Sequence, residues 1–155
     1  MFNMTKRYTL FKEIIKLSVA KNWEIAKKEW KLDHIYTALE AQTCLCGHHP
    51  IIEICVIKNL KNNEHTFLGN CCIKVLLGIG SNKMFNSLKK IREDIRNSIN
   101  KPLITFLFEK GVLSEKETIF YLNVCRKRKF SVKQATWKID INQKILTYFD
   151  KKTQA

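Results

Sequence analysis

A dense cluster of cysteines and histidines constrains this sequence more than any other feature. The segment 43–74 holds five of the six cysteines and three of the four histidines, opening with CLCGH at 44–48 and closing with GNCC at 69–72. In a reducing compartment, clustered cysteines bind metal more often than they form disulfides. The spacing therefore predicts a bound Zn²⁺ ion that joins two distant parts of the chain and contributes directly to folding.

Cys44, Cys46 and Cys72 are the strongest candidate zinc ligands. A C-x-C pair in a turn that contains glycine lets both thiolates face one point, and Cys72 lies where a helix is expected to start, so the helix dipole favours its thiolate. We take His48 as the fourth ligand because it completes a C-x-C-x-H spacing. Four protein donors make the zinc structural, since no position is left for water. The alternatives for the fourth position are Cys71, His65 and Cys55.

Between the two ends of this segment the sequence predicts a β-hairpin and a short helix. An apolar, β-branched run at 51–57, a polar turn at 59–63 and a second run at 65–68 indicate two paired strands. The helix is expected to start near Cys72 and to end at a glycine soon afterwards, because glycine commonly follows the last helical turn.

Hydrophobic periodicity predicts helices before the segment as well. Residues 5–40 are expected to form a helical arm, with Asn22 as an N-cap between two helices. Trp23 and Trp30 are seven residues apart and would lie on one helical stripe, packed on the zinc-binding hairpin. A base-stacking role for these two rings is the alternative.

The C-terminal half is expected to form a helical bundle. Ser81 is predicted to cap an amphipathic helix whose apolar face extends to Ile99, and Pro102 is predicted to lie in the first turn of the next helix. Two patterns of the S-x-x-E/Q type, at 114–117 and 131–134, predict capping boxes. These boxes start two further helices joined by a short connection.

Together these elements predict one mostly α, α+β domain over residues 1–150. It consists of a helical arm (5–40), a zinc-bound hairpin (41–80) and a basic helical bundle (81–150), followed by a flexible tail (151–155). The sequence has no apolar run of about 18 residues and no signal-peptide pattern. We therefore expect a soluble, cytoplasmic protein without membrane contacts, whereas the sequence does not indicate its oligomeric state.

The distribution of charge predicts a polyanionic partner. The chain carries 28 Lys and Arg residues against 14 Asp and Glu, a formal net charge of +14, and residues 81–155 alone hold 17 against 7. Excess positive charge on one part of a chain is typical of proteins that contact phosphate groups. DNA or RNA is therefore the expected partner, and the C-terminal half is expected to contact it.

The most cationic part of this half is RKRKFSVKQATWK at 126–138, from the end of one predicted helix into the next. Its cations would contact phosphates, whereas Gln134 and Trp137 would lie near a base edge or a sugar. The plainer alternative is a solvated helix corner whose cations interact with the C-terminal dipole of the preceding helix. The candidate nucleic-acid-binding residues are Arg126, Lys127, Arg128, Lys129, Lys133, Gln134, Trp137 and Lys138.

Several short motifs are spread along the chain: EWxL at 29–32, TCLCGH at 43–48, GNCC at 69–72, RKR at 126–128 with SxKQ at 131–134, and INxKI at 141–145. On these motifs most of the chain resembles small zinc-finger-like proteins of phages and prophages. The zinc segment is similar in layout to a treble clef, in which a cysteine loop, a hairpin and ligands at a helix start follow one another. The resemblance implies a mobile-element protein with metal ligands at Cys44, Cys46 and Cys72. It departs from the treble-clef pattern at Asn70, where a fourth cysteine often stands.

Two other functions are compatible with these features. A basic phage protein can occupy the nucleic-acid channel of a host enzyme, so the chain could bind and inhibit a host defence or replication complex. An HNH-like, metal-dependent nuclease would use His48 and His49 beside a hairpin. Here the histidines precede the hairpin, and no carboxylate lies beside them in the sequence. We therefore predict a non-enzymatic, zinc-stabilised protein that binds nucleic acid.

Overall fold

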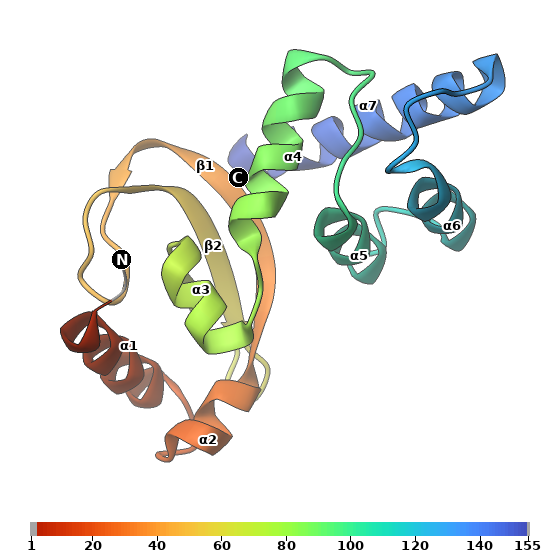
Figure 1. Cartoon of the computed structure of the whole chain (residues 1–155). Helices are drawn as coiled ribbons and strands as arrows, with labels where there is room; N and C mark the ends of the chain where they lie inside the picture. Colours follow the sequence, from red (N-terminus) through yellow and green to blue (C-terminus); the bar gives the residue numbers. More distant parts are fainter. Residues whose placement is uncertain (1–2, 155) are drawn as a thin grey trace. The chain divides into compact units, whose positions relative to one another are not determined.

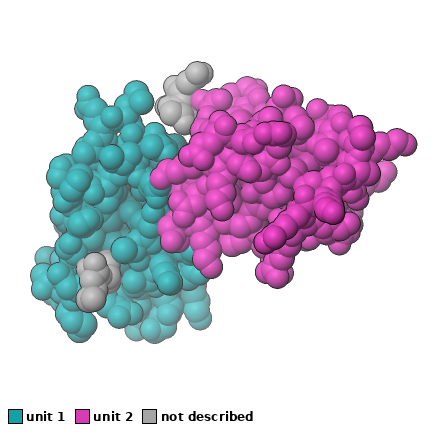
Figure 2. Space-filling model, turned by 45° about the horizontal axis from the view of Figure 1, so that its top comes forward, with its two compact units in different colours: residues 1–81 teal, residues 82–155 magenta. Residues whose placement is uncertain are grey.

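The computed structural model describes residues 3–154 of the chain (Figure 1). It has an α+β fold in which helices predominate and which contains one small antiparallel sheet. The chain divides into two compact units, unit 1 (Met1–Ser81) and unit 2 (Asn82–Ala155) (Figure 2), and the single domain expected over residues 1–150 stays a prediction. Among the described residues, no helix combines the length and the apolar character that crossing a bilayer requires.

Unit 1 contains the three-stranded sheet and the helices around it (Figure 1). The strands follow the order β1–β2–β3, and both neighbouring pairs are antiparallel. Helix α3 contacts all three strands. In chain order the elements are α1 (Met4–Leu17), α2 (Trp23–Ala26), the 3₁₀ turn η1 (Lys27–Glu29), β1 (Trp30–Gln42), β2 (Ile51–Asn59), β3 (His65–Leu68) and α3 (Asn70–Leu77).

The predicted hairpin is confirmed. Strands β2 and β3 pair with Cys55 opposite Leu68. In the turn between them Asn63 has a φ of 63°, and asparagine is one of the few non-glycine residues that adopt this conformation readily. The side chain of Asn59 closes the turn by accepting a hydrogen bond of 2.8 Å from the backbone N–H of Lys61.

The predicted helical arm is correct only as far as Glu29. The N-cap at Asn22 is confirmed, but residues 30–42 form the long strand β1. Trp30 lies opposite Asn59 of β2, and Ile35 lies opposite Cys55. The hydrogen bonds of this ladder and the burial of both side chains on the sheet outweigh the helical spacing of the tryptophans.

A buried carboxylate joins the segment after α1 to the sheet. Glu29 is 4% exposed and accepts hydrogen bonds from the backbone N–H groups of Val19 (2.9 Å) and Ala20 (2.8 Å) and from Nδ2 of Asn59 (2.8 Å). Burial alone would raise the pKa of Glu29, but the three hydrogen bonds outweigh it, so the pKa lies below its usual value. The ionised carboxylate thus holds this segment against the end of β2.

Unit 2 is helical throughout its regular elements. Both predicted capping boxes are present: Ser114 with Glu117, and Ser131 with Gln134, exchange two hydrogen bonds each. Pro102 lies in the first turn of its helix, as predicted. The helices are α4 (Ser81–Glu93, whose first residue closes unit 1), α5 (Lys101–Glu109), α6 (Glu115–Val124) and α7 (Val132–Gln154).

Two helix ends differ from the prediction. Helix α4 ends at Glu93, earlier than predicted, where Nδ2 of Asn97 donates a hydrogen bond of 2.8 Å to the carbonyl oxygen of Lys90. Such side-chain bonds compete with the helical ladder and commonly end it. Residues 151–154, expected to lie in a flexible tail, continue α7, and Ala155 lies outside the described residues.

A buried polar network fixes α7 against the connection between α4 and α5. Asn142 is fully buried, and its Nδ2 donates to the carbonyl oxygens of Ile95 (2.8 Å) and Asn97 (2.7 Å). Its Oδ1 accepts a hydrogen bond of 2.7 Å from the hydroxyl of Tyr121, which itself accepts one of 3.1 Å from the N–H of Ile99. Burial raises the pKa of Tyr121 to about 12, so this hydroxyl keeps its proton.

The substitution Glu29→Gln tests the buried carboxylate. A glutamine side chain has one acceptor oxygen and an NH₂ group that only donates, so at least one of the N–H groups around it loses its partner. We expect the free energy of unfolding at pH 7 to fall by about 1–3 kcal/mol. Glu40→Gln, at an exposed position of β1, is the matched control and should leave it unchanged.

The pH dependence of this difference follows from the lowered pKa of Glu29. A carboxylate with a lowered pKa stabilises the fold above its ordinary value of 4.5, and this contribution is lost as the pH falls further. The difference between wild type and Glu29→Gln should therefore shrink below pH 4.5 in urea denaturation over a pH series. A difference that is absent at pH 7, or constant with pH, would contradict this account of Glu29.

Candidate metal centre and nucleic-acid interface

Two separate segments of unit 1 bring the three predicted cysteines together. Cys44 and Cys46 lie between β1 and β2, and Cys72 lies in the first turn of α3. In the first segment the N–H of Gly47 donates to the carbonyl oxygen of Cys44 (2.8 Å), and the N–H of Cys44 donates to that of His48 (2.9 Å). Gly47 has a φ of +91°, a conformation that favours glycine. This tight turn keeps both thiols close together.

Gly69 brings the second segment against the first. It immediately precedes α3, and its N–H donates to Sγ of Cys44 at 3.3 Å. A Cβ atom at this position would lie only 3.1 Å from Cγ2 of Ile51, at the start of β2. A larger residue would therefore press on Ile51 and move the start of α3 away from the cysteine turn. The glycine of the GNCC motif thus sets the distance between the two halves of the site.

The spacing of the three sulfur atoms fits a metal site. The thiols of Cys44, Cys46 and Cys72 are buried and lie within 4.8 Å of one another, and Sγ of Cys44 is 3.5 Å from Sγ of Cys72. With a Zn–S distance of about 2.3 Å, ligands at the corners of a tetrahedron lie about 3.8 Å apart. The three cysteines therefore form a cluster that could hold a metal ion, as predicted.

Hydrogen bonds and burial set the protonation of this cluster. A hydrogen bond links the sulfur atoms of Cys44 and Cys72, and this bond, with the backbone N–H groups of Cys46 and Gly69, lowers the pKa of Cys44. The same hydrogen bond and burial raise the pKa of Cys72, and burial raises that of Cys46. A metal ion binds thiolates and must displace the protons of this cluster, so its affinity decreases as the pH is lowered.

Asn70 links the metal cluster to the surrounding elements. Its Nδ2 donates to Oε1 of Glu53 (2.7 Å), and its Oδ1 accepts from Oγ of Ser81 (2.5 Å) and from the thiol of Cys55 (3.8 Å). These contacts connect β2, the start of α3 and the start of α4. Ser81, predicted to cap α4 from outside, is its first residue and uses its hydroxyl here instead. Asn70 therefore holds elements together and is not part of the cluster.

His48 lies beside the cysteines without joining them. It is exposed and lines a pocket of about 390 Å³ together with the three cysteines, Lys6 and Glu53. Nζ of Lys6 lies 2.7 Å from Nδ1 of His48. An ammonium group only donates, so Nδ1 accepts this hydrogen bond. In this arrangement the lone pair of Nδ1 is used by Lys6 and is not offered to a metal ion.

The alternative fourth ligands have different surroundings. Cys71 is exposed and lines the same pocket as the cluster. His65 is exposed at the start of β3, opposite Lys58, and is not among the residues that line the pocket. Cys55 is buried in β2, where burial raises its pKa to about 12 and keeps it a neutral thiol. Of these three residues, Cys71 alone lines the pocket.

No protein-family model, curated protein or solved structure matches the chain at a significant level. The resemblance to phage zinc-finger-like proteins and the treble-clef layout therefore stay predictions. The function proposed below therefore rests on the geometry and the charge of the chain's own residues.

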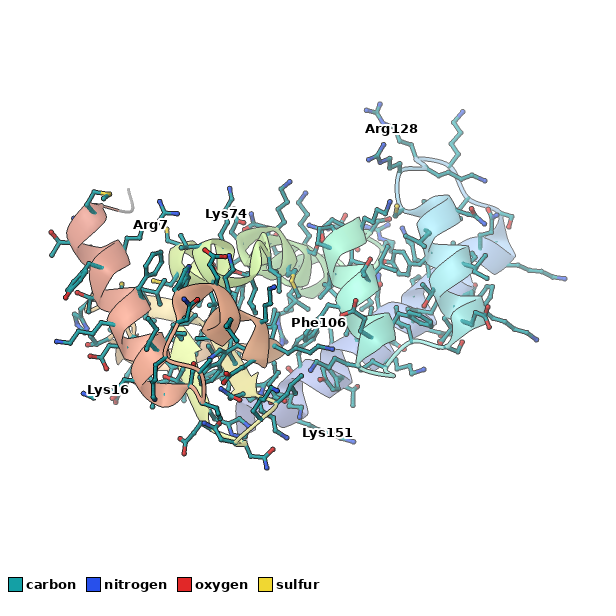
Figure 3. The ribbon with its side chains drawn as sticks, turned by 90° about the horizontal axis from the view of Figure 1, so that it is seen from below. Arg7, Lys16, Lys74, Phe106, Arg128 and Lys151 are labelled. Atoms are coloured by element: carbon teal, nitrogen blue, oxygen red, sulfur yellow. The ribbon has the colours of Figure 1, made fainter. Side chains whose placement is uncertain are left out.

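The predicted nucleic-acid-binding residues surround the connection between α6 and α7. Residues 126–129, which we name the cationic connection, are exposed, and so is Lys133 in the first turn of α7. Figure 3 shows Arg128 pointing into solvent at the tip of this connection. Among residues 3–154, no carboxylate is paired with the side chains of the cationic connection. Its four positive charges are therefore uncompensated.

Gln134 and Trp137 have structural contacts of their own. Oε1 of Gln134 accepts a hydrogen bond of 3.1 Å from the N–H of Ser131 and so caps α7. Trp137 stacks on Phe120 of α6 with ring centroids 4.2 Å apart, and 40% of Trp137 is exposed. The stacking holds the two helices together, while the exposed part of the indole faces solvent.

Lys138 is not placed as the sequence predicted. It is 3% exposed, its Nζ donates to Oγ of Ser98 at 3.0 Å, and the same Nζ lies 4.1 Å from the ring centroid of Phe130. Burial lowers its pKa, and a cation–π contact with Phe130 offsets part of the lost hydration. The ammonium group is therefore not presented to a phosphate at the surface alongside the cationic connection.

Sequence reasoning missed the residues that surround the cysteine cluster. Lys6 is in contact with His48 across 42 positions of the chain, and Glu53 lines the same pocket and accepts a hydrogen bond from Asn70, 17 positions away. No local pattern indicates either contact. Asn70 did carry a signal, since it departs from the cysteine expected in a treble clef, and its position at the first residue of α3 places its side chain against β2.

We expect protein purified without chelator to contain close to one zinc ion per chain by elemental analysis. Cys44→Ser and Cys72→Ser each remove a thiolate from the cluster, so both should lose the metal and lower the melting temperature by about 10 °C or more. Cys125→Ser, which changes a partly exposed thiol in unit 2, is the matched control and should keep both properties. Unchanged metal content and melting temperature in Cys44→Ser or Cys72→Ser would contradict the assignment.

Proposed function

We propose that this protein is a zinc-stabilised nucleic-acid-binding protein, and not an enzyme, in which unit 1 holds the metal and unit 2 contacts the phosphate backbone. The observation that supports this most is the cationic connection, with four consecutive exposed cations and no paired carboxylate among residues 3–154. Such clusters bind the phosphates of nucleic acid without reading its sequence.

Favourable interactions with helix dipoles explain the positions of only some of these cations. Cations that follow α6 interact favourably with its C-terminal end, but Lys129 and Lys133 lie close to the N-terminal end of α7, where positive charge is unfavourable. Helix α7 has no acidic residue in its first turn to offset them. Repulsion between neighbouring cations weakens the fold further. An arrangement that opposes folding in this way supports a role in binding a polyanion.

We further propose that the ion is a structural Zn²⁺ held by Cys44, Cys46, Cys72 and His48. Three thiolates at tetrahedral spacing favour a thiophilic ion such as zinc. His48 lines the same pocket as the cysteines, and its ring becomes a ligand once it exchanges the ammonium of Lys6 for the ion. Zinc bound in this way joins the β1–β2 connection to the start of α3.

Cobalt substitution tests the fourth ligand, because the absorption of Co²⁺ depends on how many thiolates bind it. We expect His48→Ala to weaken zinc binding by more than about tenfold and to shift the cobalt spectrum. Cys71→Ala, which changes the exposed neighbour of Cys72, is the matched control and should leave both unchanged. The reverse pattern would assign the fourth position to Cys71, and no effect in either variant would assign it to water.

Nucleic-acid binding is tested with Lys127→Gln/Arg128→Gln/Lys129→Gln. We expect wild type to bind short DNA and RNA strands with an affinity that falls steeply with salt. The variant should bind more weakly, and the slope of log K against log salt should become shallower by about 2, as expected when three phosphate contacts are lost. Fluorescence anisotropy across a salt series measures both quantities.

The control removes the same charge elsewhere. Lys12→Gln/Lys16→Gln/Lys31→Gln changes three exposed lysines of unit 1 and should bind like wild type. Equal weakening in both variants would show that net charge alone matters and that the cationic connection is no interface. A wild-type protein with no affinity at low salt, or with affinity independent of salt, would contradict the proposed function itself.

A further inference from the structure

Unit 2 contains a second hollow, whose lining is cationic. This groove has a volume of about 780 Å³ and is bordered by α4, the start of α5 and the end of α6. No Asp or Glu is among its lining residues, although unit 2 contains seven acidic residues. The charged residues that line it are Lys83, Lys90, Lys101 and Arg126.

The charge of this groove is uncompensated. Each of the four cations is exposed, and within the described part of the chain none of them is paired with a carboxylate. Carboxylates of unit 2 are instead paired with cations outside the groove: Asp94 with Arg96, Glu117 with Lys144, and Asp150 with Arg92. Four like charges around one hollow attract an anion more strongly than the same charges on a convex surface, because low-dielectric walls focus their field.

Polar groups in the groove suit a phosphate oxygen as well. Oγ of Ser98 accepts the hydrogen bond from the buried ammonium of Lys138, so the hydroxyl proton of Ser98 is free to donate to a ligand. Lys138 itself brings a fifth positive charge behind this residue. The N-terminus of α5 borders the groove at Lys101, and its dipole adds to the positive potential.

The uncharged lining indicates which part of a nucleic acid fits. Its apolar members are aliphatic, namely Ile99, Pro102 and Leu122, and no aromatic ring from the described part of the chain lines the groove. Sites that bind bases stack them on aromatic side chains, whereas lysines and arginines follow the backbone. A flexible single strand can enter a concave groove, but the rigid cylinder of a duplex meets it only at the rim. The groove therefore suits the sugar–phosphate chain of a single strand.

We propose that this groove binds the phosphodiester backbone of single-stranded nucleic acid, continuing the path that begins at the cationic connection. Arg126 belongs to both surfaces, since it is the first residue of the cationic connection and lines the groove. This inference rests on the proposed function and adds to it the class of ligand and a second contact surface. Binding is independent of base sequence because the groove offers cations and hydroxyl donors but no stacking platform.

The test uses the full-length protein and a labelled oligothymidylate of about 12 nucleotides, which forms no duplex. In Lys83→Gln/Lys90→Gln/Lys101→Gln we expect at least tenfold weaker binding at low salt and a salt slope shallower by about 2. The affinity of this variant for a duplex of the same length should fall much less. The variant therefore loses the preference for single strands that we expect of wild type. The charge-matched variant Lys12→Gln/Lys16→Gln/Lys31→Gln should behave like wild type, and circular dichroism should show equal helicity in all proteins.

The outcomes separate this inference from the proposed function. If wild type binds with a steep salt dependence but the groove variant matches the charge-matched control, the groove inference is overturned and the cationic connection alone carries binding. If the groove variant loses duplex and single-strand binding equally, single-strand selectivity is overturned. If wild type binds neither ligand, the proposed function fails, and with it the groove as a nucleic-acid site. The single variant Lys101→Gln, expected to lower the slope by about 0.7, provides a second measurement with minimal perturbation of the fold.

Discussion

The close approach of the cysteine turn to the start of α3 is the contact on which unit 1 depends. The turn at 44–48 precedes β2, and Gly69 follows β3, so this contact closes the whole β2–β3 hairpin into a loop. Closing a loop of this length costs conformational entropy, and the proposed metal ion, shared by the two ends, would hold the loop closed more strongly. Gly69 favours this close approach because it lacks the Cβ atom that would press on Ile51.

The central strand β2 is held at both of its ends by polar side chains, which are half-buried near its start and buried at its far end. Near its start, Glu53 accepts from Asn70, which carries the contact on to Ser81. At its far end, Asn59 donates to Glu29, whose carboxylate also binds the segment after α1. Such groups are costly to bury unless every hydrogen bond is made, and they then specify one arrangement of the elements. The cysteine cluster therefore rests on a sheet that these polar contacts hold in position without a metal ion.

Local signals in the sequence predicted much of this fold, and contacts over long distances did not. Capping boxes, the hairpin and the cysteine cluster each depend on residues a few positions apart or on the chemistry of one residue type. Strand β1 was missed because Trp23 and Trp30 share a helical spacing, while pairing with β2 decides the conformation after Glu29. The burial of Lys138 depends on Ser98, forty positions away. The cationic groove collects side chains from three helices, and no single stretch of sequence displays it.

The two units differ in how much charge they carry and in what offsets it. Residues 1–81 hold 11 Lys and Arg against 7 Asp and Glu, whereas residues 82–155 hold 17 against 7. At the proposed site, Zn²⁺ with three thiolates and a neutral imidazole would have a net charge of −1, and Lys6 lies at the same pocket, so the proposed metal site would be close to neutral. Unit 2 has no such compensation at its cationic connection and groove. Its fold tolerates the repulsion because an apolar core and the Tyr121–Asn142 network stabilise it away from these surfaces. The excess charge is thus concentrated at the cationic connection and the groove, and in the proposed function the phosphates of a nucleic acid would neutralise it and relieve the repulsion.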